Sequence, residues 1–291
     1  MGSLDGRVAI ITGAGRGIGR EHALLFAAEG AKVVVNDLGG APDGQGSDET
    51  AAEQVAREIR ELGGDAVANG DDVADWEGGQ RLVNTAIEAF GRLDVLVNNA
   101  GILRDRVLVN MTEEEWDAVV KVHLKGHFVP TRWAAAYWRE QAKAGNEVKA
   151  NVVNTSSTSG LLGNPGQSNY GAAKAGIGAF SWIVSQELGR YGVRVNCIAP
   201  AARTRLTEAT PGLGEMVQPP SDASVFDIWD PANVSPVVAY LSTADCPFSG
   251  CTFFVQGGTV KRMTPWQMGD GVEIDHRWTV DELAKELPNL L

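Results

Sequence analysis

The sequence predicts an α/β protein built on one doubly wound parallel sheet of seven strands, with helices on both faces. Short apolar runs rich in β-branched residues, typical of buried parallel strands, alternate with stretches of helical periodicity. Sheets of this kind bind ligands at the carboxyl ends of their strands. No internal repeat is visible, and residues 1–291 fit one domain of this class. The strand-like runs cover residues 7–12, 32–37, 66–73, 93–98, 151–155, 193–198 and 252–256.

The first strand-like run leads into a glycine-rich turn and then into a helical pattern. Residues 7–11 (RVAII) precede TGAGRGIG (12–19), and HALLFAAEG follows. In this context the glycines permit a tight turn and a close backbone approach, so that a pyrophosphate lies at the helix N-terminus. The alternative is a flexible turn without a ligand. We expect a Rossmann-type dinucleotide site with the candidates Gly13, Gly15, Arg16, Gly17, Ile18 and Gly19.

The second strand-like run ends on an acidic residue. Residues 32–36 lead into Asp37 and Leu38, and the acid follows the glycines by roughly the twenty residues that this site type requires. A carboxylate there accepts hydrogen bonds from the adenosine ribose and repels a 2′-phosphate. Arg16 favours the opposite choice, and a solvated turn aspartate is the other alternative. We predict NAD rather than NADP as the cofactor.

Three side chains carry the predicted chemistry. Tyr170 and Lys174 lie four residues apart, and Ser157 lies thirteen residues before the tyrosine. On a helix, the tyrosine and lysine share one face, where an ammonium group would lower the tyrosine pKa from about 10 towards neutrality. Such a tyrosine exchanges a proton with an alcohol or a carbonyl, while the serine hydroxyl holds the same oxygen. The pattern predicts an alcohol dehydrogenase or carbonyl reductase.

Together these motifs resemble the short-chain dehydrogenase/reductase family over residues 4–260. The resemblance implies that Asp72 and Val73 contact the adenine, and that Lys174 also holds the nicotinamide ribose. The fourth catalytic position, usually Asn in the family, is His123 here; its backbone carbonyl would hold a water in a proton relay. The matching residues are Thr12, Gly13, Gly17 and Gly19 (TGxxxGxG), 98–101 (NNAG), and Ser157, Tyr170 and Lys174. The other implied cofactor contacts are Asn99, Ala100, Gly101, Val122, Tyr170, Pro200, Ala202 and Thr204, with Ala201 where the family has Gly.

A closer resemblance is to the (3R)-hydroxyacyl-CoA dehydrogenase unit of peroxisomal multifunctional enzyme type 2, also described as 17β-hydroxysteroid dehydrogenase type 4. It rests on NDLGG (36–40), NNAGILRDR (98–106) and VHLKG (122–126). The resemblance implies NAD-dependent oxidation of a (3R)-hydroxyacyl-CoA. Three alternatives stay open: a 17β-hydroxysteroid dehydrogenase, a 3-oxoacyl thioester reductase, and a non-catalytic NAD-binding redox sensor.

Charge and composition narrow the partners. A formal charge of −12 without a basic block argues against nucleic acid and against an anionic membrane surface. No apolar stretch reaches the roughly 18 residues that a membrane span needs. The cysteines Cys197, Cys246 and Cys251 form no disulfide framework, and neither a signal peptide nor a peroxisomal tail pattern is visible. We expect a cytoplasmic protein that acts on a small molecule.

Two loops flank the expected cleft. Residues 38–48 form a Gly- and Asp-rich loop beside the adenine pocket, and residues 205–230 lie where the family has its substrate lid. The lid would cover an acyl chain or a steroid; a plain Pro-rich connection is the alternative. Its apolar candidates are Leu206, Leu213, Met216, Val217, Phe226 and Trp229, and the cations available to a CoA are Arg104, Arg106 and Arg203.

Capping-box patterns start helices at Thr112 and Thr279, the latter within a C-terminal extension, 261–291. Pro130 predicts a kink or an interruption in a helix. His123 and His127 have the spacing of two metal ligands, but no third ligand is evident, so we interpret them as packed histidines and predict no metal. The family associates as homodimers or homotetramers. The aromatic residues of a packing or self-association face would be Trp133, Tyr137, Trp138, Phe180 and Trp182.

Overall fold

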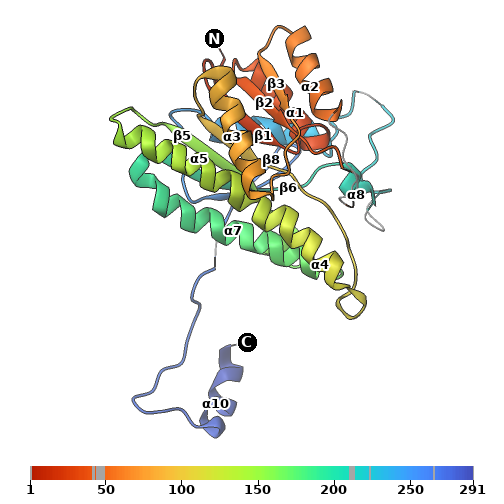
Figure 1. Cartoon of the computed structure of the whole chain (residues 1–291). Coiled ribbons are helices and arrows are strands. Elements are labelled where there is room, and N and C mark those ends of the chain that lie inside the picture. The colour runs from red at the N-terminus through yellow and green to blue at the C-terminus, as the bar shows by residue number, and fades with distance from the viewer. Residues whose placement is uncertain are drawn as a thin grey trace.

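The computed structural model describes residues 2–40, 43, 50–209, 214–222, 224–264 and 266–290. Within them one sheet of eight strands runs in the order β3-β2-β1-β4-β5-β6-β7-β8 (Figure 1). All neighbouring pairs are parallel except β7 and β8. The order in which strands are added to the sheet reverses between β1 and β4, which pair side by side and run parallel. The strands are β1 (Val8–Thr12), β2 (Lys32–Asn36), β3 (Ala66–Asn69), β4 (Val95–Asn98), β5 (Ala150–Thr155), β6 (Val193–Pro200), β7 (Thr252–Gln256) and β8 (Thr259–Met263).

Helices cover both faces of this sheet. On one face lie α1, α2 and α9, and on the other lie α3, α5 and α7. The α-helices are α1 (Gly17–Ala28), α2 (Thr50–Glu61), α3 (Trp76–Phe90), α4 (Glu113–Val120), α5 (Gly126–Lys143), α6 (Thr158–Leu161), α7 (Ser168–Leu188), α8 (Arg205–Ala209), α9 (Ser235–Leu241) and α10 (Val280–Glu286). The 3₁₀ turns are η1 (Leu108–Asn110), η3 (Gly189–Tyr191), η4 (Pro231–Val234) and η5 (Leu287–Leu290), and η2 (Lys121–Lys125) is a π-helix.

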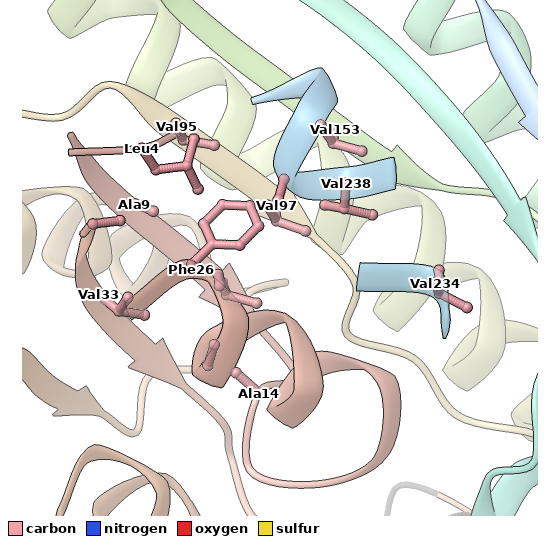
Figure 2. Packing of buried hydrophobic residues seen from close by; sticks show 14 of the residues in the cluster. Leu4, Ala9, Ala14, Phe26, Val33, Val95, Val97, Val153, Val234 and Val238 are labelled. Carbon is pink, nitrogen blue, oxygen red and sulfur yellow. The ribbon is translucent and has the colours of Figure 1, made fainter. Parts of the chain in front are cut away.

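The two faces of the central strands pack against separate apolar cores, as period-two alternation requires. In β1, Ala9 and Ile11 join the core under α1, whereas Val8 and Ile10 join the core under α3, α5 and α7. Figure 2 shows Phe26 of α1 at the centre of the first core, between the sheet and Val238 of α9. Both cores hold the strand ends, and the side chains on them, in fixed positions.

The prediction of a parallel, doubly wound sheet is confirmed for β1 to β7. The antiparallel β8 was not predicted, and its first residues lie inside the expected family core while the last lie in the expected tail. Its sequence, TVKRM, is polar and mostly exposed, so it lacks the apolar run that marks the other strands. Edge strands need no such run, because one side of the strand stays unpaired.

Both capping boxes are confirmed, at the N-termini of α4 and α10. Of the kink or interruption predicted at Pro130, the interruption is wrong, because α5 runs through that residue, and the kink stays a prediction. The irregularity lies just before α5 instead, in the π-helix Lys121–Lys125. A π turn inside a helix is often found at a functional site, and this one contains His123. Among the described residues, no helix is long and apolar enough to cross a membrane.

Candidate active site

The candidate active site is a cleft of about 440 Å³ along the carboxyl ends of β1, β4, β5 and β6. It lies where the strand order reverses, which is the usual ligand position in such sheets. The structure brings almost all the sequence candidates to this cleft, and Gly15 is the exception. Those that line it are Gly13, Arg16, Gly17, Ile18, Gly19, Asp37, Leu38, Asp72, Val73, Asn99, Ala100, Gly101, Val122, His123, Ser157, Tyr170, Lys174, Pro200, Ala202 and Thr204.

The glycine-rich turn forms a backbone cradle that side chains would fill. A Cβ on Gly19 would lie 2.1 Å from the carbonyl oxygen of Gly13, and Gly13 itself has a φ of 63°. Thr12 fixes the opposite wall, because its hydroxyl accepts hydrogen bonds from the backbone N–H groups of Asn99 (2.9 Å) and Ala100 (3.1 Å). The Asn99 amide donates to the carbonyls of Thr12 and Gly13. This cradle at the N-terminus of α1 fits the pyrophosphate of a dinucleotide.

Asp37 has a second role besides the one expected of it. Its carboxylate accepts hydrogen bonds from the backbone N–H groups of Gly15 (2.8 Å) and Gly39 (2.7 Å). A Cβ on Gly15 would lie 2.9 Å from that carboxylate, so Gly15 supports the turn from behind rather than facing the cleft. Much of the 38–48 loop, which the sequence placed beside this pocket, lies outside the described residues.

Two arginines share the environment of Asp37. Burial lowers the pKa of Arg205, the nearby charge of Arg16 lowers it further, and Asp37 opposes the change. Both arginines line the cleft. Arg205 was not predicted, because it belongs to the lid region, where all the predicted residues are apolar.

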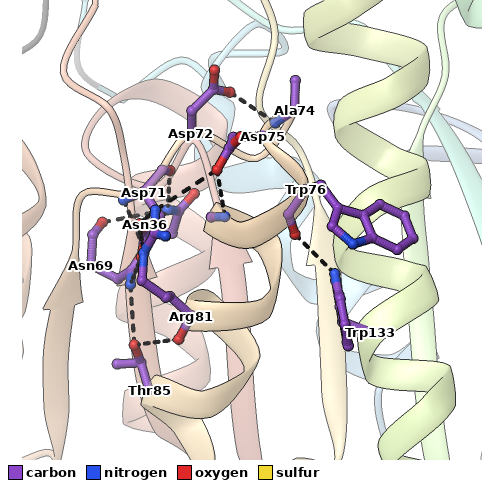
Figure 3. A network of polar contacts seen from close by, with 11 residues as sticks. Asn36, Asn69, Asp71, Asp72, Ala74, Asp75, Trp76, Arg81, Thr85 and Trp133 are labelled. Atoms are coloured by element: carbon purple, nitrogen blue, oxygen red, sulfur yellow. Dashed lines mark hydrogen bonds and ion pairs between the residues drawn. The ribbon is translucent and has the colours of Figure 1, made fainter.

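A polar network joins the end of β2 to the turn at residues 71–73 (Figure 3). The Asn36 amide at the end of β2 donates to the side-chain oxygen of Asn69 (2.8 Å) and to the carbonyl of Asp71 (3.0 Å). Asp72 accepts from the backbone N–H of Ala74 (2.8 Å) and pairs with Lys121 at 3.4 Å. These contacts hold the 71–73 turn, where the predicted adenine contacts lie.

Ser157, Tyr170 and Lys174 come together beyond the carboxyl end of β5. The Lys174 ammonium donates to the carbonyl of Thr155 at 2.5 Å and lies 5.5 Å from the centre of the Tyr170 ring. Ser157 is the N-cap residue of the short α6, and its hydroxyl hydrogen-bonds to Tyr170. Tyrosine and lysine lie one turn apart on α7, as their spacing predicts.

The expectation that the pKa of Tyr170 is lowered towards neutrality is wrong. Burial raises the pKa of Tyr170 to about 12; the Ser157 hydrogen bond lowers it and the charge of Asp105 raises it further. Burial also lowers the pKa of Lys174 to about 7, with Cys197 opposing that change. Both groups are enclosed, and enclosure favours the neutral form of each. The lysine therefore does not bring the tyrosine towards neutrality here.

His123 occupies the fourth catalytic position, inside the π-helix. Its ring lies edge-on to the Tyr170 ring, with 5.1 Å between the ring centres. Its Nε2 lies 2.8 Å from the carbonyl oxygen and 3.1 Å from the backbone nitrogen of Ile102. Burial holds the pKa of this ring well below its usual value, and Lys174 lowers it further. The backbone carbonyl accepts from Gly126, and its proposed role in a proton relay stays a prediction.

His127 is as deeply buried as His123. Its Nε2 lies 3.4 Å from the backbone nitrogen of Thr155, and burial lowers its pKa to about 3. In the part of the chain that the structure describes, no group of three or more His, Cys, Asp or Glu side chains is arranged to hold a metal. The two rings make protein contacts.

The lid residues divide into two groups. Val217 is buried and lines the cleft together with Trp229, whereas Met216 and Phe226 are 66% and 60% exposed. Leu213 and the side chain of Leu206 lie outside the part of the chain that the structure describes. Arg203 ties the lid together, because it donates to the Val217 carbonyl (2.8 Å) and pairs with Asp227 (2.5 Å).

The cations expected to meet a CoA are already engaged. Arg104 pairs with Glu114 (3.0 Å) and Arg106 pairs with Glu115 (3.0 Å). Sequence reasoning also missed part of the cleft wall, namely Thr155, Asn164, Gln167 and Arg205. The polar run GNPGQSN (163–169) directly before Tyr170 was the available signal for two of them.

A glycine cradle beside a Ser–Tyr–Lys group in one cleft defines an oxidoreductase that works with a nicotinamide dinucleotide. The chain belongs to the short-chain dehydrogenase/reductase family, since the family model for short chain dehydrogenase matches residues 7–216. A crystal structure of a short chain dehydrogenase from Mycobacterium avium superposes with a TM-score of 0.88 at 49% identity, covering 99% of this chain and 95% of that one.

Two curated relatives carry more specific names. Hydroxyacyl-CoA dehydrogenase ChsB1 of Mycobacterium tuberculosis is 43% identical over 98% of this chain and 88% of its own length. Peroxisomal multifunctional enzyme type 2 of Drosophila melanogaster is 47% identical over 84% of this chain and 38% of its own length. The resemblance to that enzyme's dehydrogenase unit is confirmed.

Proposed function

We propose that this enzyme oxidises the 3-hydroxyl group of a (3R)-hydroxyacyl-CoA to the 3-oxo group, with NAD as the acceptor. The observation that carries the proposal is the intact Ser157–Tyr170–Lys174 group in a chain similar, over nearly its whole length, to a protein named hydroxyacyl-CoA dehydrogenase. The apolar lid side chains Val217 and Trp229 at the cleft suit an acyl chain.

The three catalytic side chains have separate tasks in this proposal. The substrate hydroxyl lies between the hydroxyl groups of Ser157 and Tyr170, and Ser157 orients it. Tyr170 takes the hydroxyl proton as the general base. A bound nicotinamide would supply the acceptor for the hydride that leaves the carbinol carbon. Lys174 would contact the nicotinamide ribose, and its bond to the Thr155 carbonyl keeps it at the base of the cleft.

The choice of NAD rests on Asp37. Its carboxylate stands at the end of β2, on the rim of the cleft, and is held by two backbone N–H groups. A 2′-phosphate at this point would meet that negative charge. Arg16 and Arg205 lie on the same rim, and in this proposal they face the pyrophosphate rather than the ribose.

The reductive direction is the second candidate. A half-buried tyrosine with a pKa of about 12 is protonated at neutral pH, so it is ready to give a proton to a carbonyl oxygen rather than to remove one from an alcohol. This observation favours a 3-oxoacyl thioester reductase. A 17β-hydroxysteroid dehydrogenase would use the same three side chains with a rigid apolar substrate.

One kinetic panel tests the proposal. Initial rates of NADH formation are measured with (3R)- and (3S)-hydroxyacyl-CoA thioesters, with 17β-hydroxysteroids, and again with NADP. We expect turnover of the (3R) thioesters with NAD. Turnover of steroids alone would refute the thioester assignment, and faster reduction of 3-oxoacyl thioesters with NADPH than any oxidation would establish the reductase.

We also propose self-association through the outer face of α5 and α7, which carries the half-exposed Phe128, Trp182 and Ile183. Trp138, one of the predicted face residues, is instead a core residue, and its indole donates to the Leu93 carbonyl (2.7 Å). Light scattering tests this: a dimer or tetramer that dissociates in Trp182→Glu supports the proposal, and a monomeric wild type refutes it.

A further inference from the structure

A row of amide and carboxyl groups lies in the cleft wall beside Tyr170. The loop after β4 and the loop before α7 run side by side here: Arg106 pairs with Gln167 in a parallel bridge, and the Arg106 N–H donates to the Gly166 carbonyl (2.8 Å). Gln167 is the N-cap residue of α7, one turn before Tyr170. Its side chain lines the cleft and is only 7% exposed.

Hydrogen bonds fix the orientation of the Gln167 amide. Its Nε2 donates to Asp105 Oδ2 (2.7 Å), and its Oε1 accepts from the Asn164 amide (2.9 Å). A carboxylate only accepts, so the nitrogen must face Asp105. An amide nitrogen has two hydrogens, and the described hydrogen bonds use one of them. A donor left over on a nearly buried side chain is costly unless a ligand accepts from it.

We propose that Asp105 is a positioning residue which holds the Gln167 amide so that its second N–H donates to the acyl oxygen of the substrate. The inference rests on the proposed function for the identity of that oxygen, the thioester carbonyl. A 3-hydroxyacyl thioester carries its two oxygens on carbons separated by one methylene. Gln167 and Tyr170, one turn apart on α7, offer one partner for each oxygen.

Asp105 also acts on the chemistry through its charge. It is half-buried, one of its oxygens is enclosed with no hydrogen-bond partner, and its charge raises the pKa of Tyr170. The other groups around the tyrosine are Ser157, Lys174 and the buried His123 ring. Of all these groups, only Asp105 is an acid. Neutralising Asp105 therefore moves the pH dependence of turnover, which loss of a purely structural tie would not do.

The first test compares two substrates, a (3R)-hydroxybutyryl thioester and 2-butanol, which lacks the acyl oxygen. Gln167→Leu should lower the ratio of kcat/KM for the thioester over the alcohol by roughly tenfold, the effect expected for one lost hydrogen bond in an enclosed site. Gln186→Leu is the matched control, because Gln186 is exposed on the same helix, and it should leave the ratio unchanged. An unchanged ratio in Gln167→Leu would overturn the inference.

The second test separates positioning from charge. Asp105→Leu removes the acceptor and should lower the ratio as much as Gln167→Leu does. Asp105→Asn keeps an acceptor, so it should restore most of the ratio while shifting the ascending limb of the pH–rate profile for oxidation to lower pH, because Tyr170 then loses its proton more easily. Equal pH profiles for Asp105→Asn and the wild type would refute the role of the charge. A wild type active on 2-butanol but not on thioesters would refute both this inference and the proposed function, whereas thioester activity with an unchanged ratio refutes this inference alone.

Discussion

The inner wall of the cleft and the lid over it are built on different principles. Behind the wall, buried polar side chains hydrogen-bond to one another: the Asn98 amide donates to Thr131 and Asn154 (both 2.9 Å), and Asn154 donates in turn to Ser181 (2.9 Å). In the lid, Met216 and Phe226 are exposed. The wall is therefore fixed before any ligand binds, whereas the lid has apolar surface still to bury. In the proposed function, the first region carries out the chemistry and the second selects the substrate.

The substitution Tyr170→Phe, in the cleft wall, should have the largest effect on turnover. Removing the hydroxyl deletes the acid–base group, so turnover should fall by about a thousandfold or more. The ring still packs against His123, so dinucleotide binding, measured by fluorescence of the bound reduced cofactor, should stay within about twofold of the wild type. Substantial residual turnover would remove Tyr170 from its proposed role, while loss of dinucleotide binding would show that the wall depends on this hydroxyl.

Substitution of Asp37 should have the next largest effect, on the preference between the two cofactors. Asp37→Ser removes the negative charge that faces a 2′-phosphate, so the preference for NAD over NADP should fall by roughly a hundredfold. The measurement is the ratio of kcat/KM for the two cofactors. Because Asp37 also supports the Gly15 and Gly39 backbone, Asp37→Asn serves as the control that keeps these acceptors in part. A ratio that does not move would place the specificity in the arginines instead.

Behind the cleft wall, the buried His127 ring predicts a loss of stability at acid pH. The pKa of His127 is about 3 in the folded protein, against an ordinary value of 6.5. The unfolded chain therefore binds more protons below pH 6.5, and stability falls as the pH decreases from there towards 3. This histidine alone should cost about 1.4 kcal/mol of unfolding free energy at one pH unit below the ordinary value.

Urea unfolding between pH 5.5 and 7.5 measures the effect, with His127→Gln as the comparison. The variant should lose less stability than the wild type over this range. His22 is a useful reference, since burial lowers its pKa to about 3 as well, but it lies on α1, where it hydrogen-bonds to Ser235 of α9 and does not line the cleft. Parallel pH curves for His127→Gln and the wild type would contradict the prediction.

The same two regions explain what sequence could and could not foresee. The parallel sheet and the cleft wall follow from local patterns: Gly13 and Gly19 must be glycine because backbone lies where a Cβ would be, and Tyr170 and Lys174 meet because four residues make one helical turn. Side chains that meet only through tertiary packing left no such pattern. Gln167 and Asp105 are far apart in sequence.

Electrostatics was the other gap in the prediction. Spacing alone suggested that Lys174 would lower the pKa of Tyr170, but the sign of the change depends on burial, which no short motif records. In the lid, Arg203 was considered as a free cation for CoA, whereas folding brings Asp227 against it. A local pattern predicts which groups are present, and the tertiary structure decides which charges remain available.

Breaking the ion pair between Arg203 and Asp227 should have the smallest effect of these substitutions. It tests whether the lid acts on substrate binding rather than on the chemical step. Arg203→Met breaks the contacts to Asp227 and to the Val217 carbonyl while keeping an apolar stem of similar length. The KM for the substrate should rise by roughly fivefold, because a partly exposed ion pair stabilises by at most about 1 kcal/mol. The kcat should change less than KM, since the wall is untouched. Arg190→Met, at an exposed position beyond α7, is the control. A fall in kcat that exceeds the rise in KM would mean that the lid also sets the geometry of the reacting groups.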